Sequence, residues 1–311
     1  MIQYASELKD FHDLLSAVAT WRGQSLAIIE KDYYLTRALN ALASKHQGQF
    51  ILKGGTSLSK GWNLLDRFSE DMDILVRPQP KAGTSSRTTL LKKLREAVAD
   101  TPGFSLDSED KRTRSEVGVS RSAVFHYTSI TSDTTGLGRN ILLEAGFRGN
   151  ASASVSRLIQ SIISEYALEK GHSALAQDLK TFDLDLQDTR RTFVEKLFAI
   201  HAAYTTNYCA NKMRHYYDVS RLCEVEEIQA FVGTDEYRTC VNDVRALSVE
   251  SFPDQAVPPQ GSLASLPALR PPDAAFKTLE KNYKNEADIF FSKPPTLREI
   301  FTTIEGLRPA L

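Results

Sequence analysis

The sequence predicts an α+β protein in which a mixed sheet flanked by helices is followed by a mainly helical region. Apolar residues recur at helical spacing near the N-terminus, and short apolar runs bounded by Gly or Pro follow as far as about residue 150. Helical spacing then returns after Ser152. The chain has 311 residues, 41% of them hydrophobic, which is enough for two domains. We therefore expect a first domain over residues 1–150 and a mainly helical second domain over residues 151–311.

The elements of the first domain follow from these patterns in order. We expect helices over 7–21 and 27–45, a strand over 49–53, a short helix within 57–65, a strand over 71–77, a helix over 89–100, and strands over 122–130 and 139–147. In the second helix, Glu30, Lys31 and Asp32 suggest a structural network that orients the helix pair.

The second domain is predicted from helical spacing over 191–207 and 212–225, with no convincing strand after Ser152. Six of the twelve prolines lie between Pro253 and Pro272, which indicates a long irregular connection before the last helices. No internal repeat is visible.

Composition excludes several classes of protein. No apolar run approaches the roughly 18 residues of a membrane span, and the first residues lack a secretory pattern, so we expect a cytoplasmic protein with no membrane partner. Cys209, Cys223 and Cys240 form no CxxC pair and are expected to be ordinary thiols. A net charge of −1 argues against a general nucleic-acid coating protein. Basic residues nevertheless cluster at Arg87, Lys92, Lys93 and Arg95, and at Lys111, Arg112, Arg114 and Arg121.

Asp71 and Asp73 are the first candidate site residues. They are two apart in a predicted strand, so their carboxylates point to the same face. Such a pair tolerates ionisation best around a cation, and hard oxygen ligands without nearby Cys or His favour Mg²⁺ over zinc. Glu144, in the strand over 139–147, could supply a third acid. Three acids on neighbouring strands could hold two Mg²⁺ ions for phosphoryl transfer.

The glycines upstream fit the same chemistry. Gly54 and Gly55 would let the backbone approach a ligand closely, and Thr56 or Ser57 could cap the following helix. The N–H groups at the start of that helix would then be free to bind an anion, and a triphosphate is the anion that we expect there. Each motif alone is weak evidence for a nucleotide site. Their combination is much stronger evidence, because the motifs occur in the order strand, GG, short helix and DxD.

That order resembles the signature of the polymerase-beta-like nucleotidyltransferase fold. The segment KGGTSLSKGWNLLDRFSEDMDI is similar to its version in the AbiEii/AbiGii-type toxin family. Further blocks occur in the family's order: IEKDYYLTRAL at 29–39, TFVEKLFAI at 192–200, RHYYDVSRL at 214–222 and, more loosely, LEKNY at 279–283. The resemblance implies a toxin of a bacterial toxin–antitoxin or phage-defence operon that transfers nucleotides from an NTP, with tRNA as acceptor.

The resemblance also implies roles for particular residues. Ser69 and Asp71 match the family's Ser-x-Asp, and Asp73 matches its second acid. Lys196 matches the lysine of the third block, where it would hold phosphates. Asp218 matches the aspartate of the fourth block, in which Arg214 could pair with Asp218, with Glu224 or with a phosphate. That block usually begins Arg-Asp but here reads Arg214-His215, and Glu144 is assigned by position only.

The expected function is therefore transfer of NMP from an NTP to RNA, most plausibly a tRNA 3′ end, with Mg²⁺ and release of pyrophosphate. The second domain would close the nucleotide and acceptor cleft, the basic residues would contact RNA, and a cognate antitoxin would be the protein partner. Two alternatives stay open. The acceptor could be a protein or a small molecule, or the fold could serve as an inactive nucleotide-binding module.

Overall fold

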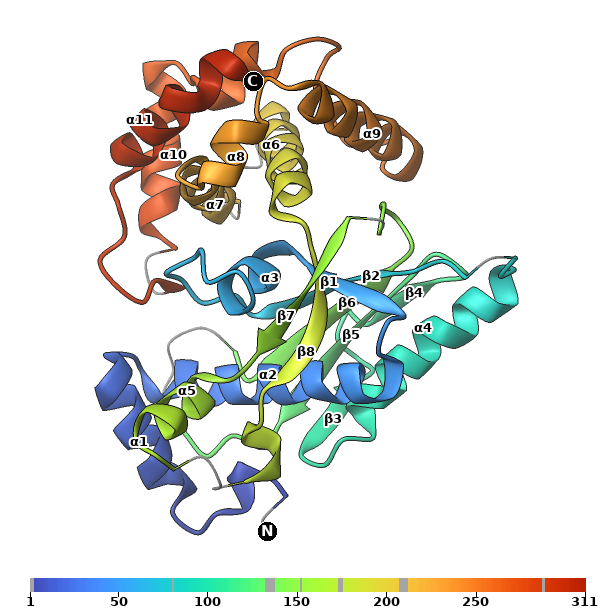
Figure 1. The fold of residues 1–311 in the computed structure, drawn as a ribbon, viewed down its shortest axis with the longest axis vertical. Helices are drawn as coiled ribbons and strands as arrows, with labels where there is room; N and C mark the ends of the chain where they lie inside the picture. Colours follow the sequence, from blue (N-terminus) through green and yellow to red (C-terminus); the bar gives the residue numbers. More distant parts are fainter. Residues whose placement is uncertain are drawn as a thin grey trace. The chain divides into compact units, whose positions relative to one another are not determined.

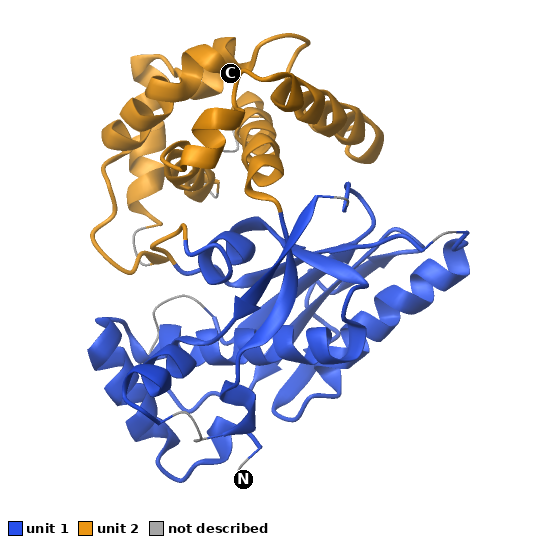
Figure 2. Ribbon diagram, viewed as in Figure 1, with its two compact units in different colours: residues 1–63, 68–187 blue, residues 64–67, 188–311 orange. Residues whose placement is uncertain are grey.

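The computed structural model describes residues 3–79, 81–131, 138–151, 153–172, 176–206, 212–286 and 289–311. The chain forms two compact units (Figure 2). The first consists of Met1–Asn63 and Phe68–Gln187, and the second of Leu64–Arg67 and Asp188–Leu311. The first unit thus continues past residue 150, where we predicted the boundary, and a short excursion of the chain at Leu64–Arg67 belongs to the second unit.

The first unit is built on one mixed sheet, which holds eight strands of the described chain (Figure 1). The order is β3-β5-β6-β2-β1-β8-β7, with β4 paired to β5. The pairs β1·β8 and β2·β6 are parallel and the others antiparallel. The strands are β1 (Phe50–Lys53), β2 (Asp71–Val76), β3 (Phe104–Asp107), β4 (Arg114–Glu116), β5 (Ser120–Tyr127), β6 (Asn140–Gly146), β7 (Ser154–Ile159) and β8 (Phe182–Gln187). The predicted α+β class is confirmed.

Helices cover one face of this sheet. Two long helices pack against it, α2 against β6 and β8, and α4 against β5 and β6. On the covered face Ile141, Leu143 and Ala145 of β6 are buried, whereas the alternate residues of that strand are not. The helices of this unit are α1 (Phe11–Arg22), α2 (Leu26–His46), α3 (Gly54–Lys60), α4 (Thr84–Ala99) and α5 (Ile162–Glu169), with 3-10 turns η1 (Ala5–Glu7) and η2 (Gln177–Leu179).

The prediction that no strand follows Ser152 is wrong, because β7 and β8 complete the sheet after that point. Strand β7 lies at the sheet edge and four of its six residues are exposed, so its sequence SVSRLI lacks an apolar pattern. Strand β8 buries Leu184 and Leu186, but these alternate with Asp183 and Asp185. The fully exposed β4 likewise falls in a stretch that we expected to be a loop.

The second unit is helical over its described residues, as predicted. The helices are α6 (Thr189–Thr205), α7 (Met213–Cys223), α8 (Glu226–Phe231), α9 (Asp235–Ser251), α10 (Asp273–Lys284) and α11 (Leu297–Leu307), with 3-10 turns η4 (Leu263–Ser265), η5 (Pro267–Leu269) and η7 (Arg308–Ala310). The proline-rich stretch between α9 and α10 contains only the turns η4 and η5, which agrees with the predicted irregular connection.

Two further expectations concern the chain as a whole. Cys223 is a buried and Cys240 a half-buried free thiol, and burial raises their pKa values to about 12 and about 11. Cys209 lies outside the described residues. None of the described helices combines the length and the apolar character needed to cross a membrane.

Candidate active site

Asp71 and Asp73 share one face of β2. Both are half-buried, whereas Met72 is 0% exposed and Ile74 is 1% exposed. Because successive side chains of a strand point to opposite faces, the apolar pair faces the core and the two acids face away from it. The acids therefore lie on the face predicted from the alternation in the sequence.

A row of three charged residues crosses the sheet at Asp73. Its register partners are Lys53 in β1 and Glu144 in β6. Register partners point to the same face, and neighbouring strands lie about 4.8 Å apart. Sequence reasoning had placed Glu144 near the pair but had missed Lys53, whose only signal was its position directly before Gly54.

Glu144 is exposed, although it lies in an otherwise apolar strand. Burying a charge is costly, so an acid is tolerated here only on the exposed face of the strand. Its neighbours on the same face, Leu142 and Gly146, are only partly buried, while Leu143 on the opposite face is 1% exposed. The face that carries Glu144 is open to water, so no cost of burial has to be offset there.

Gly54 packs directly against the Asp73 carboxylate. Its φ of +73° lies in the left-handed region, where glycine is favoured. A Cβ atom added at Gly54 would lie 2.3 Å from Asp73 Oδ2, which is a severe clash. The positive φ and the close approach of Asp73 both favour glycine at this position. The backbone at Gly54 and Gly55, here called the GG turn, therefore lies beside the acid pair.

Thr56 and Ser57 do not cap α3, so that prediction is wrong. The helix begins at Gly54 itself, with Lys53 as N-cap residue and no side-chain capping bond. The Thr56 hydroxyl instead donates to the Asp71 carbonyl oxygen at 2.5 Å and lies 3.0 Å from Ser69 Oγ. The Ser57 hydroxyl donates to the Gly54 carbonyl oxygen at 2.9 Å. These bonds tie the GG turn to the segment that enters β2 and bring Ser69 beside it.

The second unit contains a separate ionic cluster around Asp218. Asp218 is 0% exposed and accepts two hydrogen bonds from Arg67, at 2.7 Å each, and one from Lys196 Nζ at 2.6 Å. Arg67 and Lys196 are 2% and 6% exposed. Burial alone would raise the pKa of Asp218, but the charges of Arg67 and Lys196 outweigh it and hold that pKa well below its usual value.

This cluster differs from the one that we predicted. The partners of Asp218 are Arg67 and Lys196, not Arg214, whose backbone N–H bonds to Glu286 at 2.9 Å. His215 stays neutral, because burial and the nearby Lys196 charge lower its pKa well below 6.5. Arg67 was missed, since its partner is 151 residues away.

The structure thus gathers the predicted residues into two groups. One, in the first unit, contains Gly54, Gly55, Thr56, Ser57, Ser69, Asp71, Asp73 and Glu144; the other, in the second unit, contains Lys196, Asp218 and the added Arg67. Within the described ranges, no three His, Cys, Asp or Glu side chains converge closely enough to hold a metal ion by themselves. A metal at β2 would rest on the Asp71 and Asp73 pair.

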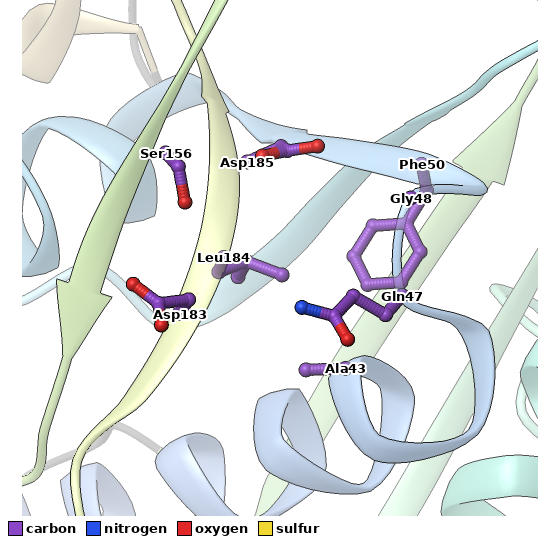
Figure 3. Close-up of a pocket in the computed structure, with 8 residues that line it drawn as sticks. All are labelled: Ala43, Gln47, Gly48, Phe50, Ser156, Asp183, Leu184 and Asp185. Carbon is purple, nitrogen blue, oxygen red and sulfur yellow. The ribbon is translucent and has the colours of Figure 1, made fainter.

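A small hollow lies at the other end of β1 from Gly54 (Figure 3). Its volume is about 20 Å³, which is room for one water molecule and not for a nucleotide. Its lining includes the side chains of Gln47, Phe50, Asp183 and Asp185. Asp185 is paired with Arg77 at 2.6 Å, which gives this acid a structural role.

Comparison with known families agrees with the geometry on β2. No relative is found among curated proteins. A family model described as nucleotidyl transferase AbiEii toxin, type IV toxin–antitoxin system, matches residues 37–303. This range includes the GG turn, both acids of β2, Glu144 and the Asp218 cluster. The chain therefore belongs to the AbiEii family of nucleotidyl transferase toxins of type IV toxin–antitoxin systems.

Proposed function

We propose that this protein transfers NMP from an NTP to an RNA acceptor, with a tRNA 3′ end as the favoured acceptor and pyrophosphate as the leaving group. The observation that carries the proposal is the contact of Gly54 with Asp73, which puts a side-chain-free stretch of backbone beside paired carboxylates. Phosphates can approach a glycine backbone closely, and phosphoryl transfer depends mainly on positioning and on neutralising charge.

The donor set of β2 fits a divalent cation. Asp71 and Asp73 offer hard carboxylate oxygens on one face, and among the described residues the Asp73 side chain makes no hydrogen bond or ion pair, its close neighbour being the Gly54 backbone. These two residues would hold Mg²⁺, which when bound neutralises phosphate charge and activates the attacking hydroxyl. Glu144, on the open face beside Asp73, would accept the proton of that hydroxyl.

The remaining roles rest on the family resemblance. Gly55, Thr56 and Ser57 would hold the phosphates through the backbone, and Ser69 would contact the nucleotide beside Asp71. Lys196 and Arg214 would bind phosphates. Because the Lys196 ammonium bonds to Asp218 at 2.6 Å, Asp218 would orient that ammonium rather than touch the substrate.

Half-buried arginines in the first unit support an RNA acceptor. Arg87 and Arg95 flank the buried Leu91 at four-residue spacing on α4, and Arg121 comes from β5. The Nε atoms of all three are buried and have no hydrogen-bond partner within the described chain. Burial and the nearby Arg95 charge lower the pKa of Arg121. The phosphodiester oxygens of an RNA would supply hydrogen-bond acceptors to these guanidinium groups, and the opposite charges would strengthen the binding.

The connection between β3 and β4 adds positive charge near the acids. Arg112 is held by Asp110, with Nη2 2.8 Å from the carboxylate. That bond is the main cause of its raised pKa, and the charges of Asp71 and Glu70 contribute further. Arg112, with Lys111 and Arg114, would contact the acceptor close to the point of transfer.

The test is incubation of purified protein with Mg²⁺, each labelled NTP in turn, total tRNA and a separate protein pool. We expect one or two NTPs to label tRNA and lengthen it on a denaturing gel. The label should disappear with the Asp71→Asn variant or with EDTA. Labelling of the protein pool alone would move the acceptor to protein, and nucleotide binding without any transfer would identify a binding module.

Membership of a type IV toxin–antitoxin family implies an antitoxin partner. We place that antitoxin in the same operon and the reaction in the cytoplasm. Asp71→Asn should then abolish growth inhibition as well as transfer, whereas inhibition that persists in this variant would count against an enzymatic toxin.

A further inference from the structure

One turn of α2 contacts both ends of the segment between α3 and β2. Lys31 and Asp32 are adjacent in sequence and 1% and 3% exposed. Lys31 Nζ lies 2.5 Å from Glu70 Oε2, directly before Asp71. Asp32 Oδ1 accepts a hydrogen bond from Lys60, the last residue of α3, at 2.5 Å. The C-terminal end of α3 and the entry to β2 are thus attached to neighbouring residues of α2.

The second oxygen of Asp32 fixes a third element. Asp32 Oδ2 accepts the backbone N–H of Ile162, the first residue of α5, at 2.8 Å. The neighbouring Glu30 accepts three hydrogen bonds at 2.7–2.8 Å, from Ser129 and Thr131 hydroxyls and the Ile130 N–H. The acids on either side of Lys31 thus fasten α2 to its surroundings, so that Lys31 itself has a fixed position.

The path of the chain between Lys60 and Glu70 explains why the contacts with Asp32 and Lys31 matter. After α3 it leaves the first unit for Leu64–Arg67 and returns at Phe68. No tight turn therefore sets the spacing between the glycines and Ser69. The Thr56 hydroxyl joins them directly, 3.0 Å from Ser69 Oγ, and Lys31 and Asp32 hold the two ends of the intervening stretch. Pairing with β6 fixes β2 from Asp71 onward and pairing with β1 fixes it from Asp73 onward, so Ser69 and Glu70 precede both ladders.

We infer that Lys31 and Asp32 are positioning residues for nucleotide transfer: they hold the C-terminal end of α3 and Glu70 at the spacing that a bound NTP requires. This inference rests on the proposed function. It replaces our expectation that the cluster merely orients the helix pair. Buried ion pairs contribute little net stability because desolvation offsets their attraction, so their effect here is on geometry.

The Lys31→Met variant tests this role. Methionine fills the space of the lysine stem, and Glu70 can be solvated because its side chain is 34% exposed. We expect the midpoint of unfolding to change little, while kcat for transfer falls about tenfold. Lys31→Arg should restore part of the activity, because it keeps a cation opposite Glu70. A full-activity Lys31→Met variant would overturn the inference.

A second readout does not depend on the reaction. Backbone hydrogen exchange at residues 54–60 and 69–73 should become at least about threefold faster in Lys31→Met and in Asp32→Asn. The matched control is Asp178→Asn, which breaks another buried pair on the same helix α2, with Arg37, and the hydrogen bond from Tyr33, but removes no bond to α3 or to Glu70. The control should leave exchange in those segments and kcat unchanged. Unaltered exchange in Lys31→Met overturns the inference, whereas wild-type protein that transfers no nucleotide overturns the proposed function alone.

Discussion

The two charged regions of this molecule are built in opposite ways. On β2 the acids are half-buried, crowd one another and face away from the core, with a glycine backbone against one of them. Around Asp218 a single acid is fully buried and saturated by two cations. Charges left close together on an open face can bind a ligand, whereas a buried acid matched by cations holds those cations in position. Both regions lie within the matched family range, so membership alone does not distinguish them.

The largest effect should come from removing a charge on β2. Asp71→Asn and Asp73→Asn should each lower transfer on the order of 10³-fold, which is the typical cost of losing one preorganised electrostatic group. Their thermal midpoints should stay near that of the wild type, because the acids face away from the core. Parallel assays of transfer and melting test this separation. A large loss of stability in either variant would mean that these acids are structural.

Asp218 should show the reverse pattern. Asp218→Asn leaves Arg67 and Lys196 buried without their counter-charge, which typically costs about 3–5 kcal/mol. Urea unfolding measures this loss, and residual activity of the folded fraction should exceed that of Asp71→Asn. If Asp218→Asn were as stable as the wild type but inactive, Asp218 would have a catalytic role, and the contrast between the β2 acids and the Asp218 cluster would not hold.

Gly54 allows the contact with Asp73 to be separated from backbone strain. Gly54→Ala and Gly48→Ala both place alanine at a positive φ, +73° and +75°, which costs about 1–2 kcal/mol. A Cβ at Gly48 meets nothing within 4 Å, whereas at Gly54 it meets Asp73. Only Gly54→Ala should therefore lower transfer, by tenfold or more. Equal activity of the two variants would show that the Asp73 contact does not matter.

The smallest effect concerns pH and the Asp218 cluster. The pKa of His215 is lowered in the folded protein, so below pH 6.5 the unfolded chain binds one more proton than the native chain. The contribution of His215 to stability is complete above pH 6.5 and is lost as the pH falls toward the folded pKa. His215→Gln should therefore reduce the slope of unfolding free energy against pH by up to about 1.4 kcal/mol per unit in that range. Identical slopes would contradict a buried neutral His215.

The sequence predicted what depends on local periodicity. Alternation placed Asp71 and Asp73 on one face, and helical spacing located α6 and α7. Strand β7 escaped detection because edge strands need not be apolar. Lys53 escaped because its place beside Asp73 follows from strand register, which no local pattern encodes.

Side-chain partners were harder to predict than elements. Thr56 looked like a helix cap, but its hydroxyl donates to the Asp71 carbonyl oxygen, which lies 15 residues further along the chain. Arg67 is not singled out by any pattern in the sequence, yet it is the main partner of Asp218. Contacts between distant segments decided both cases.

The excursion at Leu64–Arg67 bears on how such a chain can be recombined. Judged from the order of residues alone, a chimaera joined at Asp188 would exchange the whole C-terminal unit. It would instead supply Asp218 without its own Arg67, because that arginine is encoded 151 residues earlier. Chimaeras should therefore take residues 64–67 and the segment from 188 onward from the same parent, so that the Arg67–Asp218 pair is kept. The chain forms two compact units, but the second unit is assembled from two separate stretches of sequence.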